Sequence, residues 1–112
     1  MKTTCHTPGC ARRGFKRSEG YCRECYFSRC NGFTRARRDA EWLAGQTGKN
    51  YLVCEIVHPC KTVNEARLLG RKAYGTYPAR DRACLEKDGG YVVVYEYSPS
   101  QGKVFDAGHA ES

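Results

Sequence analysis

The feature that most constrains how this chain folds is a group of four cysteines near its N-terminus. Cys5 and Cys10 are separated by four residues, Cys22 and Cys25 by two, and eleven residues lie between the two pairs. Tetrahedral Zn²⁺ takes four soft ligands about 2.3 Å from the metal, and two short cysteine pairs joined by a turn supply them. Residues 5–30 show no helical or strand periodicity, so metal binding must provide their folding free energy. The sequence predicts one Zn²⁺ site formed by Cys5, Cys10, Cys22 and Cys25.

The N-terminus and the hydropathy of the chain indicate a compartment. No apolar run of about seven residues follows Met1, so a secretory signal is not expected. No segment approaches the roughly 18 to 20 apolar residues of a membrane span. In a reducing compartment, paired cysteines more often hold metal than form disulfides. We expect an intracellular protein, cytoplasmic or nuclear, with no membrane association; disulfide bonding is the alternative if a secreted chain has already lost its signal.

The positive charge of the chain is confined to its first half. Residues 1–50 contain eleven Lys and Arg against four Asp and Glu, whereas residues 51–112 contain eight of each, so the first half carries the whole net charge of +7. Four zinc-bound thiolates would contribute about −2 and reduce this excess without cancelling it. The asymmetry indicates an anionic partner, most commonly nucleic acid. The alternative is a solvated basic face that keeps the protein soluble.

Nine cationic residues cluster between residues 12 and 38, and eight of them are arginines. Arginine makes bidentate contacts with phosphate and with guanine edges, whereas a solubilising face could use lysine equally well. Five aromatic residues are interleaved with them and could stack on unpaired bases or fill the small core of a finger. We expect the following residues to contact nucleic acid or an acidic partner: Arg12, Arg13, Lys16, Arg17, Arg23, Arg29, Arg35, Arg37 and Arg38.

The residues between and after the cysteines follow a known pattern. It has a glycine four residues after the second cysteine, a glycine and an aromatic residue just before the third, and a final CxxC followed by an aromatic residue. These positions are held by Gly14, Gly20, Tyr21, Cys22, Cys25 and Tyr26. Residues 5–26 therefore resemble the A-twenty-type zinc finger of ubiquitin-editing enzymes, a Rab-five exchange factor and plant stress-associated proteins. The resemblance covers about a fifth of the chain and implies a zinc-binding finger fold.

Two adjacent positions, 12 and 13, depart from that family's pattern. Members that bind ubiquitin have an aromatic pair after the second cysteine as their recognition surface, and here Arg12 and Arg13 stand in those places. Two fixed positive charges favour phosphate or an acidic protein surface over an apolar contact. We predict a zinc-finger regulatory protein that binds DNA or RNA through its arginine-rich first half. A protein-interaction adaptor that binds ubiquitin or another acidic protein through the finger is the alternative.

The chain divides into three segments, of which residues 1–33 are the zinc finger. In residues 34–50, Thr34 can cap a helix that runs to Ala44 and ends at Gly45, and GQTGKN then forms a linker. Residues 51–112 are predicted to form a small α+β domain for partner docking or dimerisation, including a homodimer. Its expected elements are a strand over 51–57, a helix over 62–74 with Thr62 and Glu65 as a capping box, and an antiparallel hairpin over 91–97 and 103–106.

The predicted fold class is thus α+β: an N-terminal zinc finger with four cysteine ligands, a helix, and a small unit with one helix and an antiparallel sheet. Because side chains alternate along a strand, Tyr91, Val93, Tyr95 and Tyr97 are expected on one face. A row of exposed tyrosines could stack on bases or dock a protein. The alternative is that this face packs against the predicted helix 62–74.

The remaining cysteines and histidines do not indicate an enzyme. Cys54, His58, Cys60 and Cys84 include enough ligand types for a second zinc site, but their spacings fit no known ligand pattern. We interpret Cys54, Cys60 and Cys84 as small buried residues, and Cys30 as a packing residue between finger and helix. The GQTGK sequence lacks the glycine spacing and the Ser or Thr of a phosphate-binding loop. A small metal-dependent nuclease, with His58 and His109 as its candidate residues, is the enzymatic alternative.

Overall fold

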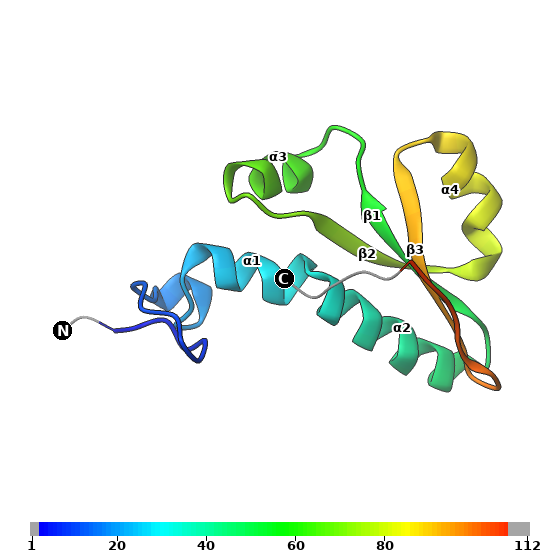
Figure 1. Cartoon of the computed structure of the whole chain (residues 1–112), viewed down its shortest axis with the longest axis horizontal. Coiled ribbons are helices and arrows are strands. Elements are labelled where there is room, and N and C mark those ends of the chain that lie inside the picture. The colour runs from blue at the N-terminus through cyan, green and yellow to red at the C-terminus, as the bar shows by residue number, and fades with distance from the viewer. Residues whose placement is uncertain (1–2, 108–112) are drawn as a thin grey trace.

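The computed structural model describes residues 3–107, which form a finger (residues 3–31) at one end of a larger body (residues 33–107) (Figure 1). The helices are α1 (Arg23–Asn31), α2 (Phe33–Thr47), α3 (Lys61–Leu68) and α4 (Arg82–Asp88). The strands are β1 (Tyr51–Ile56), β2 (Ala73–Pro78), β3 (Tyr91–Ser98) and β4 (Gly102–Asp106). None of these helices is long and apolar enough to cross a membrane.

The four strands form one antiparallel sheet in the order β2-β1-β3-β4. Helices and an antiparallel sheet together confirm the predicted α+β class, and β3 with β4 forms the predicted C-terminal hairpin. The central strand β1 contributes the three largest fully buried side chains, Leu52, Val53 and Cys54. The core of the body therefore lies on both faces of β1.

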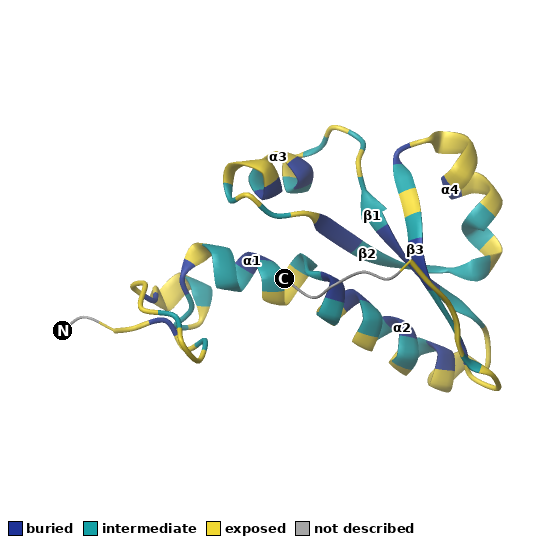
Figure 2. Ribbon diagram, viewed as in Figure 1, coloured by how far each residue is buried: buried dark blue, intermediate teal, exposed yellow. Residues whose placement is uncertain are grey.

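Helix α2 covers one face of the sheet with a stripe of small residues. Ala36, Ala40 and Ala44 recur every fourth residue and are buried against the sheet (Figure 2). The Thr76 hydroxyl donates to the Ala36 carbonyl at 2.7 Å, and the Tyr95 hydroxyl donates to Glu41 at 3.0 Å. The helix that the sequence places beside a linker is therefore part of the body.

The ends of α2 differ from the sequence prediction. The helix begins at Phe33, with Gly32 rather than Thr34 at its N-cap, because Phe33 inserts into the core beside Tyr74 and Tyr95. It does not stop at Gly45 but continues to Thr47, so only the end of the predicted linker lies outside it. A mid-helix glycine costs about 1 kcal/mol, and packing of the fully buried Ala44 outweighs that cost. Gly48, with φ of +73°, forms the C-cap.

The sequence prediction was wrong for two parts of the body. The helix expected over 62–74 ends at Leu68, with Cys60 rather than Thr62 at its N-cap, and Gly70 follows with φ of +65°. Residues 73–78 instead pair with β1 as strand β2. The sequence did not predict helix α4, because α4 buries only Leu85 and has no apolar stripe. The predicted domain over 51–112 therefore contains two α-helices, α3 and α4, rather than one.

A β-bulge separates the tyrosines of β3. Val53 of β1 faces Tyr95 and Cys54 faces Val93, so Val94 is the extra residue in β3. As a result Tyr95 packs with α2, whereas Tyr91 and Val93 pack on the opposite face with Leu85 of α4. The predicted single row of tyrosines was therefore wrong, and Tyr95 is buried rather than exposed.

Candidate metal centre and adjoining basic groove

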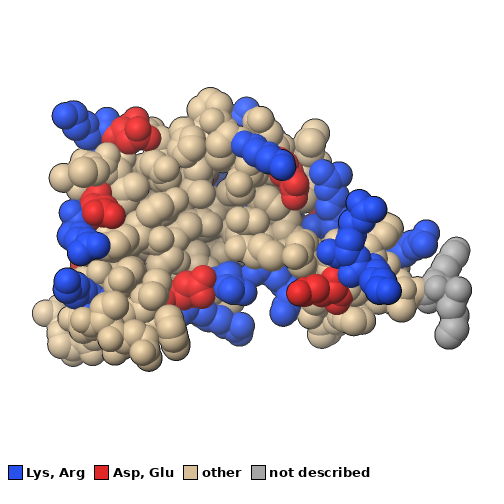
Figure 3. All heavy atoms as spheres, turned by 180° about the vertical axis from the view of Figure 1, so that it is seen from behind, with Lys and Arg blue, Asp and Glu red and all other residues tan. Residues whose placement is uncertain are grey.

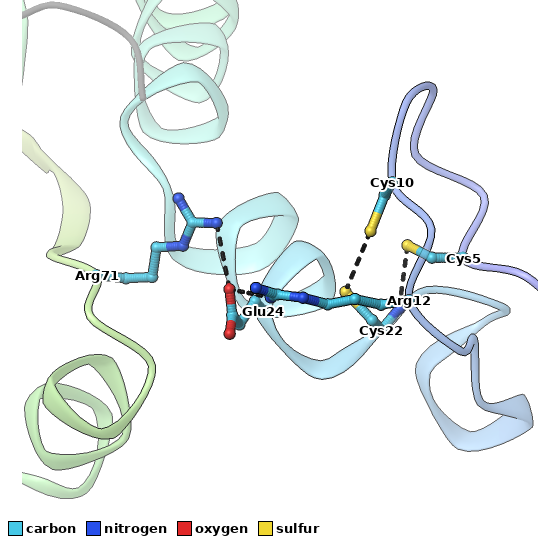
Figure 4. A network of polar contacts seen from close by, with 6 residues as sticks. All are labelled: Cys5, Cys10, Arg12, Cys22, Glu24 and Arg71. Atoms are coloured by element: carbon cyan, nitrogen blue, oxygen red, sulfur yellow. Dashed lines mark hydrogen bonds and ion pairs between the residues drawn. The ribbon is translucent and has the colours of Figure 1, made fainter.

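The finger brings the four predicted cysteines together. The Sγ atoms of Cys5, Cys10, Cys22 and Cys25 all lie within 4.8 Å of one another. Cys10 Sγ and Cys22 Sγ are 3.9 Å apart, close to the edge of about 3.8 Å that follows for a tetrahedron with metal–sulfur bonds of about 2.3 Å. Figure 4 shows the side chains of Cys5, Cys10 and Cys22 turned toward one point. This group can hold one metal ion.

Local backbone structure explains why these cysteines converge. Thr4 and Arg13 form an antiparallel bridge, and the Cys5 N–H donates to the Arg12 carbonyl at 2.8 Å, which closes the first knuckle. Cys22 is the N-cap of α1 and Cys25 lies in its first turn, so one helix start presents both ligands of the second pair. Helix α1 was not predicted, because Phe27 is the one residue it buries and its sequence shows no apolar stripe.

Two glycines allow the knuckles to close on each other. A Cβ at Gly14 would lie 2.1 Å from the Gly20 carbonyl oxygen, and a Cβ at Gly20 would lie 2.3 Å from the ring of His6. Gly20 also has φ of +89°, a backbone conformation that side chains disfavour. Both positions therefore require glycine for steric reasons within the finger itself.

Without a metal, the thiols of Cys5 and Cys25 have opposite pKa shifts. Burial raises the pKa of Cys5, but hydrogen bonds from the Cys22 and Thr7 backbones outweigh it and lower that pKa to about 6. The Cys22 N–H donates to Cys5 Sγ at 3.2 Å. A hydrogen bond from Thr7 lowers the pKa of Cys25, but burial and the neighbouring cysteines raise it to about 12. The Cys5 thiolate is thus available near neutral pH, whereas a metal must displace the proton of Cys25.

The finger is attached to the body by one buried ring and by ion pairs. Phe27 of α1 packs with Val63 and Ala66 of α3 in an apolar cluster. Glu24 lies between Arg12 of the finger and Arg71, which precedes β2, and its carboxylate is 3.5 Å from the Arg71 guanidinium (Figure 4). The hydrogen bond from Arg12 holds the pKa of Glu24 below its ordinary value.

Six of the nine predicted cations already have partners within the chain. Arg12 pairs with Glu24. The guanidinium group of Arg13 lies over the Phe15 ring, and that of Arg29 lies over the Tyr21 ring. The other paired residues, with their acidic partners, are Arg23 with Glu65, Arg35 with Asp39 and Arg37 with Glu41. Within the described chain Lys16, Arg17 and Arg38 form no ion pair. The nine residues therefore do not form one uniform surface.

Three of these arginines meet in a groove between the finger and α2. The groove has a volume of about 500 Å³. Figure 3 shows Lys and Arg side chains gathered over the finger end of the molecule and the adjoining part of the body. Sequence reasoning missed Arg71, because it follows α3 in the electrically neutral half of the chain and reaches the groove only through the fold. The main polar and aromatic residues lining the groove are His6, Tyr21, Arg29, Arg35, Arg38 and Arg71.

The other candidate ligands do not assemble. Cys54 is fully buried on β1, and burial raises its pKa to about 11. His58 Nε2 lies 3.2 Å from the Tyr91 hydroxyl, and Cys84 is exposed on α4. Among residues 3–107, no second group of three or more metal-ligand side chains comes together. Cys30 is exposed rather than packed, and His109 lies outside the described residues.

Comparison with known protein families, curated proteins and solved structures finds no match to this chain. The chain's own geometry offers two features that bear on function: four cysteine sulfurs within 4.8 Å of one another, and a groove beside them lined by arginines from separate elements.

Proposed function

We propose that this protein is a zinc-finger regulator that binds nucleic acid in the groove between its finger and α2. The observation that carries the proposal is the convergence of Arg29, Arg35, Arg38 and Arg71 on that groove. These residues come from α1, α2 and the loop before β2. Asp39 pairs with Arg35 and Glu24 pairs with Arg71, so four guanidinium groups face two carboxylates, and this excess of positive charge favours an anionic ligand. Phosphate is the anion that arginine binds most readily in bidentate geometry.

Zinc is the metal that best suits the cysteine cluster. Four thiolates at the corners of a tetrahedron are the ligand set of structural Zn²⁺ sites. Cys25 is both a proposed zinc ligand and a residue of the groove wall. Zinc binding would therefore order one wall of the nucleic-acid site, and Cys5, Cys10, Cys22 and Cys25 would have a structural rather than catalytic role.

The test is a salt series of fluorescence anisotropy titrations with labelled DNA and RNA. Arg38→Ala should weaken binding about tenfold or more and lower the slope of log Kd against log salt by about 1, because it removes one phosphate contact. Arg80→Ala is the matched control. Arg80 is also an exposed arginine without an ion pair in the described chain, but it lines a separate cavity beyond the end of α2.

Binding by wild-type protein that Arg38→Ala weakens and Arg80→Ala leaves unchanged would support the groove. No salt-dependent binding to any nucleic acid would overturn the proposal. Equal losses in both variants would also overturn it, because they would indicate diffuse attraction by net charge rather than a site. A failure of the first kind would direct attention to an acidic or ubiquitin-like protein partner.

A further inference from the structure

The exposed side of α2 carries an aromatic residue in line with the groove. Arg35, Arg38 and Trp42 are spaced by three and four residues and therefore lie on one helix face. That face is opposite the buried alanine stripe. Trp42 is the only tryptophan in the chain, and 64% of its surface is exposed. Trp42 therefore places an accessible aromatic ring on the same face of α2 as two groove arginines.

Arg35, Arg38 and Trp42, here called the exposed α2 stripe, continue the groove along α2. Arg35 and Arg38 line the groove, and Trp42 lies one helical turn beyond Arg38. Inside the groove, the Arg29 guanidinium lies 4.4 Å from the centre of the Tyr21 ring. This stacked pair offers a flat platform that a base can extend, as bases stack on aromatic rings and on guanidinium planes. Two stacking platforms are thus separated by two cations.

We infer that the groove and the exposed α2 stripe form one continuous binding site for single-stranded nucleic acid, here called the single-strand track. One unpaired base stacks on Trp42, another on the Arg29–Tyr21 pair, and the intervening phosphates contact Arg35 and Arg38. This inference rests on the proposed function and specifies the form of its ligand. It also gives Trp42 a role that the sequence pattern of cations did not suggest.

Two observations favour a single strand over a duplex. The groove volume of about 500 Å³ matches a site for a drug-sized ligand and so accommodates individual nucleotides rather than a double helix. A duplex offers no free base faces for Trp42 and Tyr21 to stack on.

The single tryptophan makes the inference directly measurable. Intrinsic fluorescence of the zinc-loaded protein is titrated with oligothymidylate and oligouridylate of about 12 nucleotides, and with a duplex hairpin whose loop is too short to stack. Anisotropy of the labelled oligonucleotides is recorded in parallel. We expect the single strands to quench Trp42 and to bind at least about tenfold more tightly than the hairpin, and the two probes distinguish DNA from RNA.

Trp42→Ala should weaken single-strand binding by about 5- to 150-fold, the effect of losing one stacked base. Trp42→Phe should restore most of the affinity because it keeps an aromatic face. Both variants should keep the circular dichroism spectrum and zinc content of wild type, since the side chain lies mostly in solvent. Leu68→Ala, at another highly exposed apolar residue on α3, is the control and should bind as wild type.

The outcomes separate this inference from the function on which it rests. Binding without quenching, equal or tighter binding of the hairpin, or an unchanged Kd in Trp42→Ala would overturn the single-strand track while leaving nucleic-acid binding intact. Absence of any binding by anisotropy would overturn both.

Discussion

The finger and the body of this protein are stabilised by different means, although they lie in one chain of 112 residues. In the body, apolar side chains on both faces of β1 are buried against α2 and α4. In residues 3–31 only Cys5, Gly14, Cys22 and Phe27 are buried, and Phe27 packs against the body. The body thus has a core of its own, whereas the finger has none, and a metal ion held by its four cysteines would supply its folding free energy.

The groove depends on both regions. Its arginines come from α1 of the finger, from α2 and from the loop before β2, and the buried face of α2 fixes that helix on the sheet. The groove is therefore complete only when both regions are folded. The comparison can be tested by perturbing one region at a time.

Loss of the metal should have the largest effect. Chelation, or Cys22→Ser, should unfold residues 3–25 and leave the sheet intact, because binding of a structural Zn²⁺ supplies about 10–16 kcal/mol to a small finger. Hydrogen exchange read by mass spectrometry should show protection lost in the finger and kept in β1 and β3. Cys84→Ser, at an exposed cysteine outside the cluster, should keep one metal per chain. Loss of protection throughout the body would contradict the division into two regions.

Phe27→Ala should have the next largest effect, because Phe27 joins the two regions. Truncation of a buried phenylalanine costs about 3–5 kcal/mol. We expect a lower Tm for the body and a Tm that no longer rises when zinc is added, since the coupling passes through this ring. Phe15→Ala removes a half-exposed ring of the same finger and should change the Tm little. Equal shifts for both substitutions would show that Phe27 has no special coupling role.

Gly14→Ala should weaken the finger alone. Its Cβ would lie 2.1 Å from the Gly20 carbonyl, and relief of that clash should cost about 1–3 kcal/mol, or roughly 5- to 150-fold in zinc affinity measured by competition with a chromogenic chelator. Gly45→Ala is the contrasting substitution in the body. Gly45 is helical with open space around its Cα, so alanine should raise stability by about 0.5–1 kcal/mol. Zinc affinity unchanged by Gly14→Ala would contradict the packing of the knuckles.

The smallest predicted effect concerns pH and is confined to the body. Burial raises the pKa of Tyr95 from 10.0 to about 12. Its stabilising contribution is therefore complete below pH 10 and is lost as the pH rises toward 12. Tyr95→Phe should lower the free energy of unfolding by about 1 kcal/mol at neutral pH, because the hydrogen bond to Glu41 is lost. Above pH 10, the free energy of unfolding of this variant should decline less steeply than that of wild type. Urea unfolding followed by Trp42 fluorescence at pH 7 and pH 10.5 measures both, and parallel declines would refute the assignment.

Two features of the sheet depend on contacts between residues far apart in the sequence, which local sequence patterns do not reveal. Residues 73–74 continue an apolar helical stripe in the sequence, yet they form β2 because Ala73 and Tyr74 pair with Ile56 and Glu55 of β1. The bulge at Val94 places Tyr91 and Tyr95 on opposite faces, although strict alternation predicts one face. In both cases long-range strand pairing outweighed local propensity.

The sequence by itself determined the features that depend on short spacings. The two cysteine pairs, and the glycines at positions 14 and 20 that close them, lie within 21 residues of one another, so their geometry follows from local turns. The α+β class followed from the periodicities of α2 and the C-terminal hairpin. The tertiary structure alone decided the groove. It brings Arg71 beside Glu24, 47 residues away in sequence, and sets Arg35 and Arg38 beside Arg29 of the finger, because only the packed sheet orients α2 against the finger.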